Sequence, residues 1–182
     1  LNTSLESLVE ERSQKLSESE KRFKVIVESA YDLIYIIDNN GFITYINNVI
    51  EEEGGFSPEE VVGTHFSEYI HEDYIESVIN NYLSYIENRA SATYTEVLSL
   101  RKSNESIWLG QNVQFSYNPD GSFREAIVIA RDITQKKKEE DELISTQLQL
   151  VSLIENMHQG VLFHSFKREI LLINSFFCEF FG

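Results

Sequence analysis

The spacing of apolar positions predicts a helix at the start of the chain. Residues 1–30 contain no Gly or Pro. Apolar residues recur there at every seventh position, at Val9, Leu16, Phe23 and Ala30. A coiled coil needs a second set of apolar positions between these, and polar residues interrupt that set. The pattern therefore fits a coiled coil and a lone surface helix equally well. Ser17, three residues before Glu20, offers a capping box that would start a second helix there.

The next segment alternates in the way that half-buried strands do. Two short runs of β-branched and aromatic residues, 33–38 and 42–47, flank the turn sequence "NNG". An Asn-Gly turn between two such runs predicts a β-hairpin. Further on, Ser57 as N-cap, Pro58 and Glu60 predict a very short helix that ends by Gly63. A longer helix is expected within residues 72–88, where apolar residues form one stripe.

Three more strand-like runs follow, at 92–100, 106–117 and 122–134, and polar turns join them. The pattern therefore predicts an α+β fold with five antiparallel strands. After Thr134 a helical pattern resumes without any Gly or Pro.

The chain contains an internal repeat. Residues 28–47 can be laid over residues 155–174 at a fixed offset of 127, since 155 − 28 = 127 and 174 − 47 = 127. Each segment has an acidic residue, a strand, a turn, a second strand and a final Asn, and the same offset places Gly55 on Gly182. A period of this length is typical of tandem domains rather than of a solenoid. We therefore expect one complete unit and the opening of a second.

Charge and cysteine content exclude several classes of partner. The chain has 15 Lys and Arg against 30 Asp and Glu, a formal charge of −15, which repels nucleic acid and anionic membrane surfaces. The single cysteine, Cys178, permits no internal disulfide and fits a reducing, cytoplasmic compartment. No apolar run approaches the roughly 18 to 20 residues of a membrane span, so no direct membrane contact is expected in this segment, whether or not the parent protein is membrane-anchored.

Several motifs, taken in order, resemble the PAS family of sensory modules. They are "IIDNNGFITYIN", "GGFSPEEVVG", "IHEDY", the hairpin "RKSNESIWLGQNVQFSYNPDG" and finally "ARDIT". The resemblance implies a PAS-like five-stranded antiparallel sheet with helices on one face, flanked by long linker helices. Its expected parts are an incoming linker helix at 1–19, a first PAS domain at 20–134, a connecting helix at 135–150 and the start of a second PAS domain at 151–182. Such modules precede histidine kinase, cyclase or regulatory domains and pass signals through helices to a dimeric output.

The chemistry of the segment is regulatory rather than catalytic. His71 and Glu72 stand at a predicted helix entry, and no Gly-rich nucleotide lid accompanies them, so no kinase site is expected here. No two histidines have the spacing of a zinc motif, so no metal site is expected. Some PAS members hold haem through a His on the long helix, and the resemblance therefore disfavours haem here, since this helix contains no His. Light-sensing members attach flavin through a Cys after the second strand, so covalently attached flavin is also disfavoured, because Cys178 lies outside the first unit.

The predicted interior suits either a closed core or a small-molecule pocket. The candidate lining residues are Ile34, Ile36, Tyr45, Phe66, Tyr69, Ile79, Tyr82, Leu98, Trp108, Val113 and Ile129. Resemblance to the Asp-x-Thr hinge of PAS domains marks Asp132, Ile133 and Thr134 as a signalling hinge, in which the Asp and Thr cap the next helix or bond to the sheet edge.

The sequence thus predicts a sensory and signal-relay module of a multi-domain protein, a sensor histidine kinase being the favoured parent. Its expected partners are a second copy paired through the linker helices, an output domain in the same chain and a small-molecule ligand. The alternative is a ligand-independent scaffold that spaces and dimerises neighbouring domains of a signalling protein.

Overall fold

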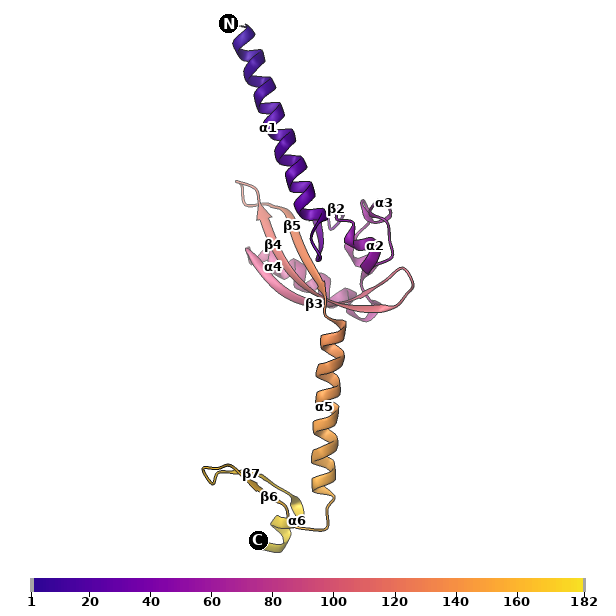
Figure 1. The fold of residues 1–182 in the computed structure, drawn as a ribbon, viewed down its shortest axis with the longest axis vertical. Helices are drawn as coiled ribbons and strands as arrows, with labels where there is room; N and C mark the ends of the chain where they lie inside the picture. Colours follow the sequence, from indigo (N-terminus) through magenta and orange to yellow (C-terminus); the bar gives the residue numbers. More distant parts are fainter. Residues whose placement is uncertain (1, 182) are drawn as a thin grey trace. The chain divides into compact units, whose positions relative to one another are not determined.

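A five-stranded antiparallel sheet forms the centre of the first part of the chain (Figure 1). The structure is a computed structural model that describes residues 2–181. Its strands are β1 (Leu33–Asp38), β2 (Ile43–Ile46), β3 (Ala92–Leu100), β4 (Ser106–Tyr117) and β5 (Phe123–Asp132). They lie in the order β2-β1-β5-β4-β3, and every neighbouring pair is antiparallel. The predicted fold class is confirmed.

Helices lie before, between and after the strands. They are α1 (Asn2–Glu28), α2 (Val49–Glu53), α3 (Pro58–Val61), the 3₁₀ turns η1 (Phe66–Tyr69) and η2 (Glu72–Tyr74), α4 (Ile75–Glu87) and α5 (Thr134–Glu155). The expected second helix start at Ser17 is wrong. With no Gly or Pro nearby, α1 continues through that position without a break. None of the helices in residues 2–181 combines the length and apolarity that a membrane crossing needs.

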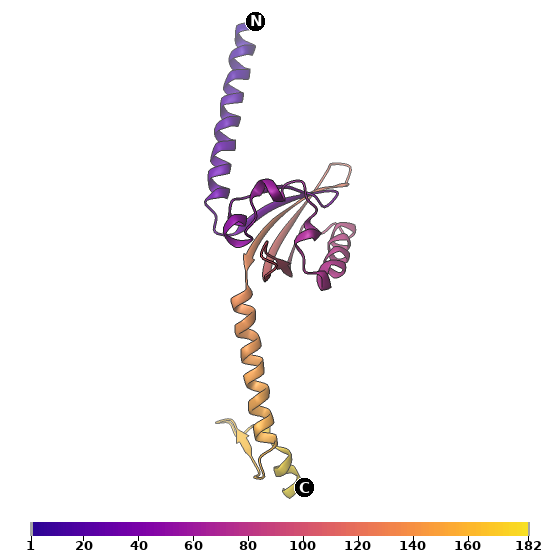
Figure 2. The same ribbon diagram turned by 90° about the vertical axis from the view of Figure 1, so that its right-hand side faces the viewer.

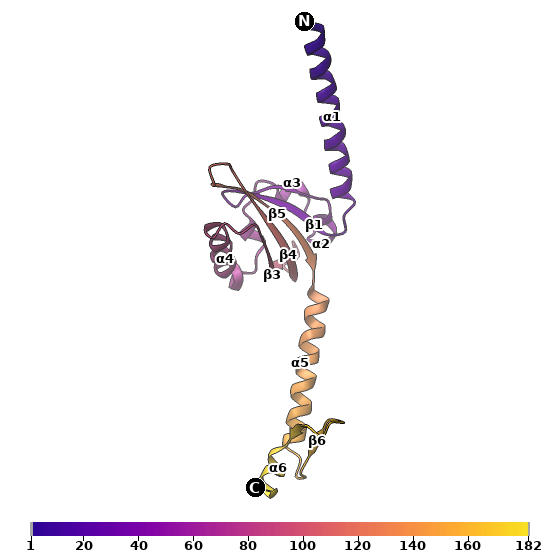
Figure 3. The same ribbon diagram turned by 90° about the vertical axis from the view of Figure 1, so that its left-hand side faces the viewer.

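The core lies on one face of the sheet. Ala126, Val128 and Ala130 of β5 are at most 1% exposed, and they belong to the same buried cluster as Val61 of α3, which is 1% exposed. Tyr82 and other side chains of α4 pack against the same cluster. Figures 2 and 3 show α4 on one side of the sheet only. Burial of such side chains contributes about 1.5–3 kcal/mol each, which makes this layer the main source of stability.

The first hairpin turn is closed by one carboxylate. Oδ1 of Asp38 accepts hydrogen bonds from the backbone N–H groups of Asn40 (2.8 Å) and Phe42 (2.9 Å). Gly41 adopts φ +87°, and a Cβ there would fall 2.3 Å from the ring of His65. Only glycine satisfies both the left-handed backbone and the close approach of this ring.

A buried asparagine fastens the end of α1 to the sheet. Asn47 is 0% exposed, and its Nδ2 donates to the carbonyl oxygens of Val27 and Asp32, each at 3.1 Å. Its Oδ1 accepts from the backbone N–H of Ile34 at 3.0 Å. The Val27 carbonyl belongs to the last turn of the helix, where backbone acceptors have no partner within the helix. We call this arrangement of Asn47 and its three backbone partners the asparagine latch.

The second part of the chain repeats the asparagine latch, residue for residue. It contains β6 (Leu162–His164), β7 (Ile170–Ile173) and α6 (Ser175–Phe181). Asn174 is also 0% exposed. Its Nδ2 donates to the carbonyl oxygens of Ile154 and Gln159 at 2.9 Å, and its Oδ1 accepts from Val161 N–H at 2.8 Å. Every one of these residues lies 127 positions after its counterpart.

A glutamate supports the asparagine latch in both places. Oε2 of Glu28 accepts a hydrogen bond from Asn48 N–H at 2.9 Å, and Oε2 of Glu155 accepts one from Ser175 N–H at the same distance. The agreement of six positions in hydrogen-bonding role goes well beyond a shared hydrophobic pattern. The segment after α5 therefore repeats the helix-to-sheet junction of the first unit.

Candidate functional site

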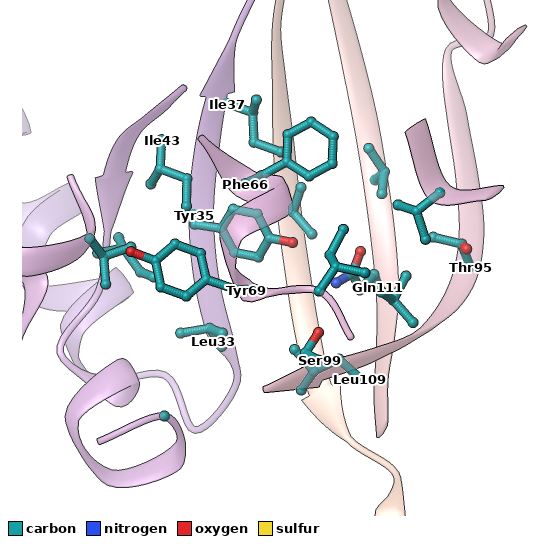
Figure 4. Close-up of a pocket in the computed structure, with 18 of the residues that line it drawn as sticks. Leu33, Tyr35, Ile37, Ile43, Phe66, Tyr69, Thr95, Ser99, Leu109 and Gln111 are labelled. Atoms are coloured by element: carbon teal, nitrogen blue, oxygen red, sulfur yellow. The ribbon is translucent and has the colours of Figure 1, made fainter. Parts of the chain in front are cut away.

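A cavity of about 110 Å³ lies between the sheet and the helices that cover it (Figure 4). All five strands contribute to its wall. Apolar members of the wall include Leu33, Ile43, Val97, Leu109, Val113 and Val128. The side chains that face the cavity are mostly aliphatic or aromatic, a composition typical of small-molecule sites.

A few polar groups interrupt this apolar wall. Gln111 and Ser99, from the two strands β4 and β3, are 8% and 6% exposed. The hydroxyl groups of Tyr35 and Tyr82 also belong to cavity-lining residues, and the Tyr82 oxygen is buried without a hydrogen-bond partner. Figure 4 shows the Tyr35 hydroxyl and the Gln111 amide turned toward the middle of the cavity, whereas the Tyr69 hydroxyl is turned away. The site thus has a small polar region in an apolar space.

Five of the candidate lining residues point to the face of the sheet opposite to the one expected from sequence. These are Ile34, Ile36, Leu98, Trp108 and Ile129, none of which lines the cavity. Successive side chains of a strand point to opposite faces, so their neighbours line it instead. Ile129, for example, is 42% exposed, while Val128 is 1% exposed.

Two further candidates also lie outside the cavity wall. The Tyr45 hydroxyl donates a hydrogen bond to Glu28 Oε1 at 3.1 Å. Ile79 of α4 is half-buried, but the helix turns Val78 and Tyr82 toward the cavity. The remaining candidates, Phe66, Tyr69, Tyr82 and Val113, do line it.

The junction between β5 and α5 is held by backbone and side-chain bonds together. Oδ1 of Asp132 accepts from the N–H of Thr134 at 2.7 Å, and Oγ1 of Thr134 accepts from the N–H of Trp108 at 2.9 Å. The N–H of Ile133 donates to the Trp108 carbonyl at 2.8 Å. Asp132 therefore caps the first turn of α5 while Thr134 ties that turn to β4. The three residues of the predicted hinge act on one joint.

Arg101 connects this joint to the cavity, and sequence reasoning did not select it. Arg101 lines the cavity at the end of β3, and its Nη2 pairs with Asp132 Oδ2 at 3.1 Å and with Glu53 Oε2 at 3.7 Å. Its Nε is buried and has no hydrogen-bond partner. A shift of the guanidinium group would therefore be felt by the carboxylate that caps α5.

The histidines of the first unit have structural roles. Nδ1 of His65 accepts from the N–H of Ser67 at 3.3 Å, and Nδ1 of His71 accepts from the N–H of Asp73 at 3.4 Å. Both rings therefore cap 3₁₀ turns, and His65 also stacks on Phe66 with ring centroids 4.8 Å apart. Within residues 2–181 no group of three or more His, Cys, Asp or Glu side chains is arranged to hold a metal ion.

The tyrosines predict a loss of stability at high pH. Burial, followed by the hydrogen bond to Glu28, raises the pKa of Tyr45 to about 12, and burial raises the pKa of Tyr35 and Tyr82. The folded state thus keeps protons that the unfolded chain loses near pH 10. Their contribution to stability is complete below pH 10 and is lost as the pH rises through the folded-state pKa values. We expect the urea midpoint to fall between pH 10 and 12, and to fall less in Tyr45→Phe; an identical decline in the variant would contradict the assignment.

These features define a class of small α+β domain, in which an antiparallel sheet and short helices enclose a cavity and the last strand runs into a helix. Solved structures share the fold. The PAS domain of a Colwellia psychrerythraea protein matches with a TM-score of 0.58 and 24% identity, over 63% of this chain and 97% of that one. A sensory box histidine kinase/response regulator from Burkholderia thailandensis matches with a TM-score of 0.58 and 21% identity, over 71% and 97%.

The chain belongs to the PAS family, since the family model described as "PAS fold" matches residues 21–133. Sporulation kinase C of Bacillus subtilis is 26% identical over 170 residues, 90% of this chain and 38% of that protein. A methyl sulfide methyltransferase-associated sensor of Methanosarcina acetivorans is 32% identical over 127 residues, 69% of this chain and 12% of that protein. The chain thus carries a sensory, non-catalytic PAS module and spans less than two fifths of the length of these relatives.

Proposed function

We propose that the PAS domain senses a small molecule in its cavity and relays the bound state through α5 to an output domain in the same chain. The observation that carries the proposal is the position of Arg101, which lines the cavity and pairs with Asp132 at 3.1 Å. Asp132 in turn caps Thr134 at the start of α5. A ligand that moves Arg101 would change the joint only if it bound the two arrangements with different free energy.

The favoured parent is a sensor histidine kinase. Similarity to Sporulation kinase C over 90% of this chain supports it, as does the similarity to a sensor from Methanosarcina acetivorans. The catalytic domain would lie outside the 182 residues. We propose a noncovalent, ring-sized ligand in place of haem or flavin. A cavity of about 110 Å³ is too small for the haem macrocycle or for the three fused rings of flavin unless the side chains of the wall move.

Residues 151–182 are proposed to begin a second PAS domain. The repeated asparagine latch of Asn174 supports this assignment. So does the hairpin of β6 and β7 just before Asn174, in which Phe163 and Ile170 are 55% and 60% exposed. In the first unit the corresponding hairpin is covered on one face by the remaining strands and helices.

A thermal-shift screen of small metabolites tests the sensing proposal directly. A ligand present at 100 times its dissociation constant stabilises the folded state by about 2.7 kcal/mol, which raises the melting temperature by several degrees. We expect at least one small uncharged compound to raise it in a saturable way. A matched screen of a variant with a filled cavity, Val97→Phe, should lose the effect. A screen that finds no stabiliser among metabolites, haem and metal ions would favour the scaffold alternative.

Both the sensing function and the scaffold alternative include the pairing of two copies of the chain through α1, which we propose here. Val9, Leu16 and Phe23 repeat every seventh residue along α1, and each is 61% or 62% exposed. Such a stripe fits a partner helix. Size-exclusion chromatography with light scattering should therefore give twice the mass of 21.1 kDa at high concentration. The variant Leu16→Glu should shift it to a monomer, while a wild-type chain that stays monomeric would contradict the pairing.

A further inference from the structure

The structure assigns a ligand class to the cavity: a ring-sized, uncharged molecule with an apolar body and one oxygen that accepts a hydrogen bond, held by Gln111. This inference rests on the proposed sensing function and adds the chemistry of the ligand. It follows from the volume of the cavity, from the polar groups that lack partners and from the charges around Arg101.

The volume sets the size of the apolar body. A dry cavity of about 150 Å³ lined by aliphatic and aromatic side chains holds one benzene molecule. The cavity here measures about 110 Å³, so the apolar body of its ligand should be no larger than a small ring. Its apolar wall, which includes Val97, Leu109 and Val128, would bury almost the whole of such a ring.

Gln111 is the polar side chain of β4 that faces the cavity. It stands in the inward row of β4, between Leu109 and Val113, and it is 8% exposed. Its amide has no hydrogen-bond partner among residues 2–181. Buried amides are nearly always bonded, because an unpaired one is costly. Figure 4 shows this amide turned into the cavity, where a ligand would meet it.

The other unpartnered groups specify an acceptor on the ligand. The Tyr82 hydroxyl and Arg101 Nε are both buried without partners, and both can donate a hydrogen bond. The guanidinium group cannot accept one, whereas the Gln111 amide can do either. A carbonyl, ether or hydroxyl oxygen on the ligand can accept a hydrogen bond from whichever of these donors it meets. A ligand that only donates would leave Arg101 Nε unpaired.

The surrounding charges exclude an anion. Among the residues that the structure describes, Arg101 is the only cation that lines the cavity, and it already faces two carboxylates, Asp132 at 3.1 Å and Glu53 at 3.7 Å. This group of three therefore has a net charge of −1. A carboxylate ligand would lose its hydration and would gain no unpaired cation in return. An uncharged oxygen bears no such penalty.

Three probes test the assignment on the 182-residue chain by titration of its amide resonances. Cyclopentanone and methylenecyclopentane share size and shape, and only the ketone can accept a hydrogen bond at oxygen; cyclobutanecarboxylate is the anion. We expect saturable shifts at cavity residues with both rings. The ketone should bind about tenfold more tightly than the alkene, because it satisfies a buried donor. The carboxylate should bind most weakly.

The variant Gln111→Leu should reduce the preference for the ketone to within about twofold while alkene binding persists. Gln114→Leu is the matched control, since Gln114 lies on the same strand but is exposed on the other face, and it should keep the tenfold ratio. Equal affinity of the wild-type chain for ketone and alkene, or tightest binding of the carboxylate, would overturn the ligand class alone. Absence of binding by all three probes would also overturn the sensing function of the cavity.

Discussion

Replacement of Asp132 by Ala is expected to uncouple stimulus from output in the full-length signalling protein. The Asp132 carboxylate caps Thr134 through Oδ1 and holds Arg101 through Oδ2. The variant Asp132→Ala removes both links at once, so the cavity loses its connection to α5. Allosteric coupling of this kind typically changes output 5- to 150-fold. In Asp132→Ala we expect the ratio of output with stimulus to output without stimulus to approach one. The measurement is output activity with and without stimulus.

The same substitution should leave the domain folded. Loss of a helix cap together with an exposed ion pair costs about 1–2 kcal/mol of unfolding free energy. Asp120→Ala is the matched control, because Asp120 also accepts a backbone bond, from Ser122 N–H at 2.8 Å, but lies in the β4–β5 turn. Normal regulation in Asp132→Ala, or equal loss of regulation in Asp120→Ala, would refute the role of the joint.

Replacement of Asn47 by Ala should have the largest effect on stability. The substitution removes the side-chain partner of Val27 O, Asp32 O and Ile34 N, around a residue that is itself 0% exposed. Val27 O keeps a hydrogen bond from Ala30 N–H at 3.3 Å, so Asp32 O and Ile34 N lose most. Each unsatisfied buried group costs about 1–3 kcal/mol, and partial hydration will recover some of it, so we expect a loss of about 3–5 kcal/mol. Urea unfolding followed by the fluorescence of Trp108, the single tryptophan, reads the first unit alone.

Two controls isolate the asparagine latch. Asn48→Ala changes a neighbouring exposed asparagine whose side chain makes no cap bond, and its midpoint should stay within about 0.5 kcal/mol of wild type. Asn174→Ala removes the corresponding latch of the second unit and should leave the Trp108 transition unchanged. A midpoint for Asn47→Ala that matches Asn48→Ala would show that the latch contributes little.

The strands were predictable because turn chemistry and alternation agree along the whole first unit. The predicted runs at 33–38, 92–100 and 106–117 match β1, β3 and β4 to the residue. Strong turn sequences bound each of them, and the backbone there has few alternatives. The course of α1 at Ser17 was harder to predict. A capping-box sequence also occurs inside continuous helices when no Gly or Pro precedes it, as in α1.

The lining of the cavity was predicted on the wrong face of four strands, for a physical reason. In β5 the larger residue Ile129 was expected inside, but small Ala126 and Ala130 are buried beside Val128. Small inward side chains leave room for a cavity, so size is a poor guide to burial here. The outward row of β4 contained the missing signal: Gly110, Asn112, Gln114 and Ser116 alternate with Ile107, Leu109, Val113 and Phe115. Because β5 pairs with β4, the inward face of β4 would then have indicated which residues of β5 point inward.

The residues missed by sequence reasoning depend on contacts between distant segments. Arg101 and Asp132 are separated by 31 positions, and neither charge has a local pattern that indicates the other. Gln111 had a weak signal, as a polar residue in an otherwise apolar inward row. The hinge residues Asp132 and Thr134 were selected through family resemblance, and the structure shows the bonds that each one makes.

The asparagine latch also indicates where the junctions of a chimeric protein should lie when PAS domains are exchanged. In both copies the latch binds carbonyls of the preceding helix, at Val27 and at Ile154, so the last helical turn belongs to the domain that follows it. A chimera joined directly before β1 or β6 would sever these bonds and leave a buried amide unpaired. A graft should instead join within α5, several residues upstream of Ile154, so that each exchanged module carries its own helical stub.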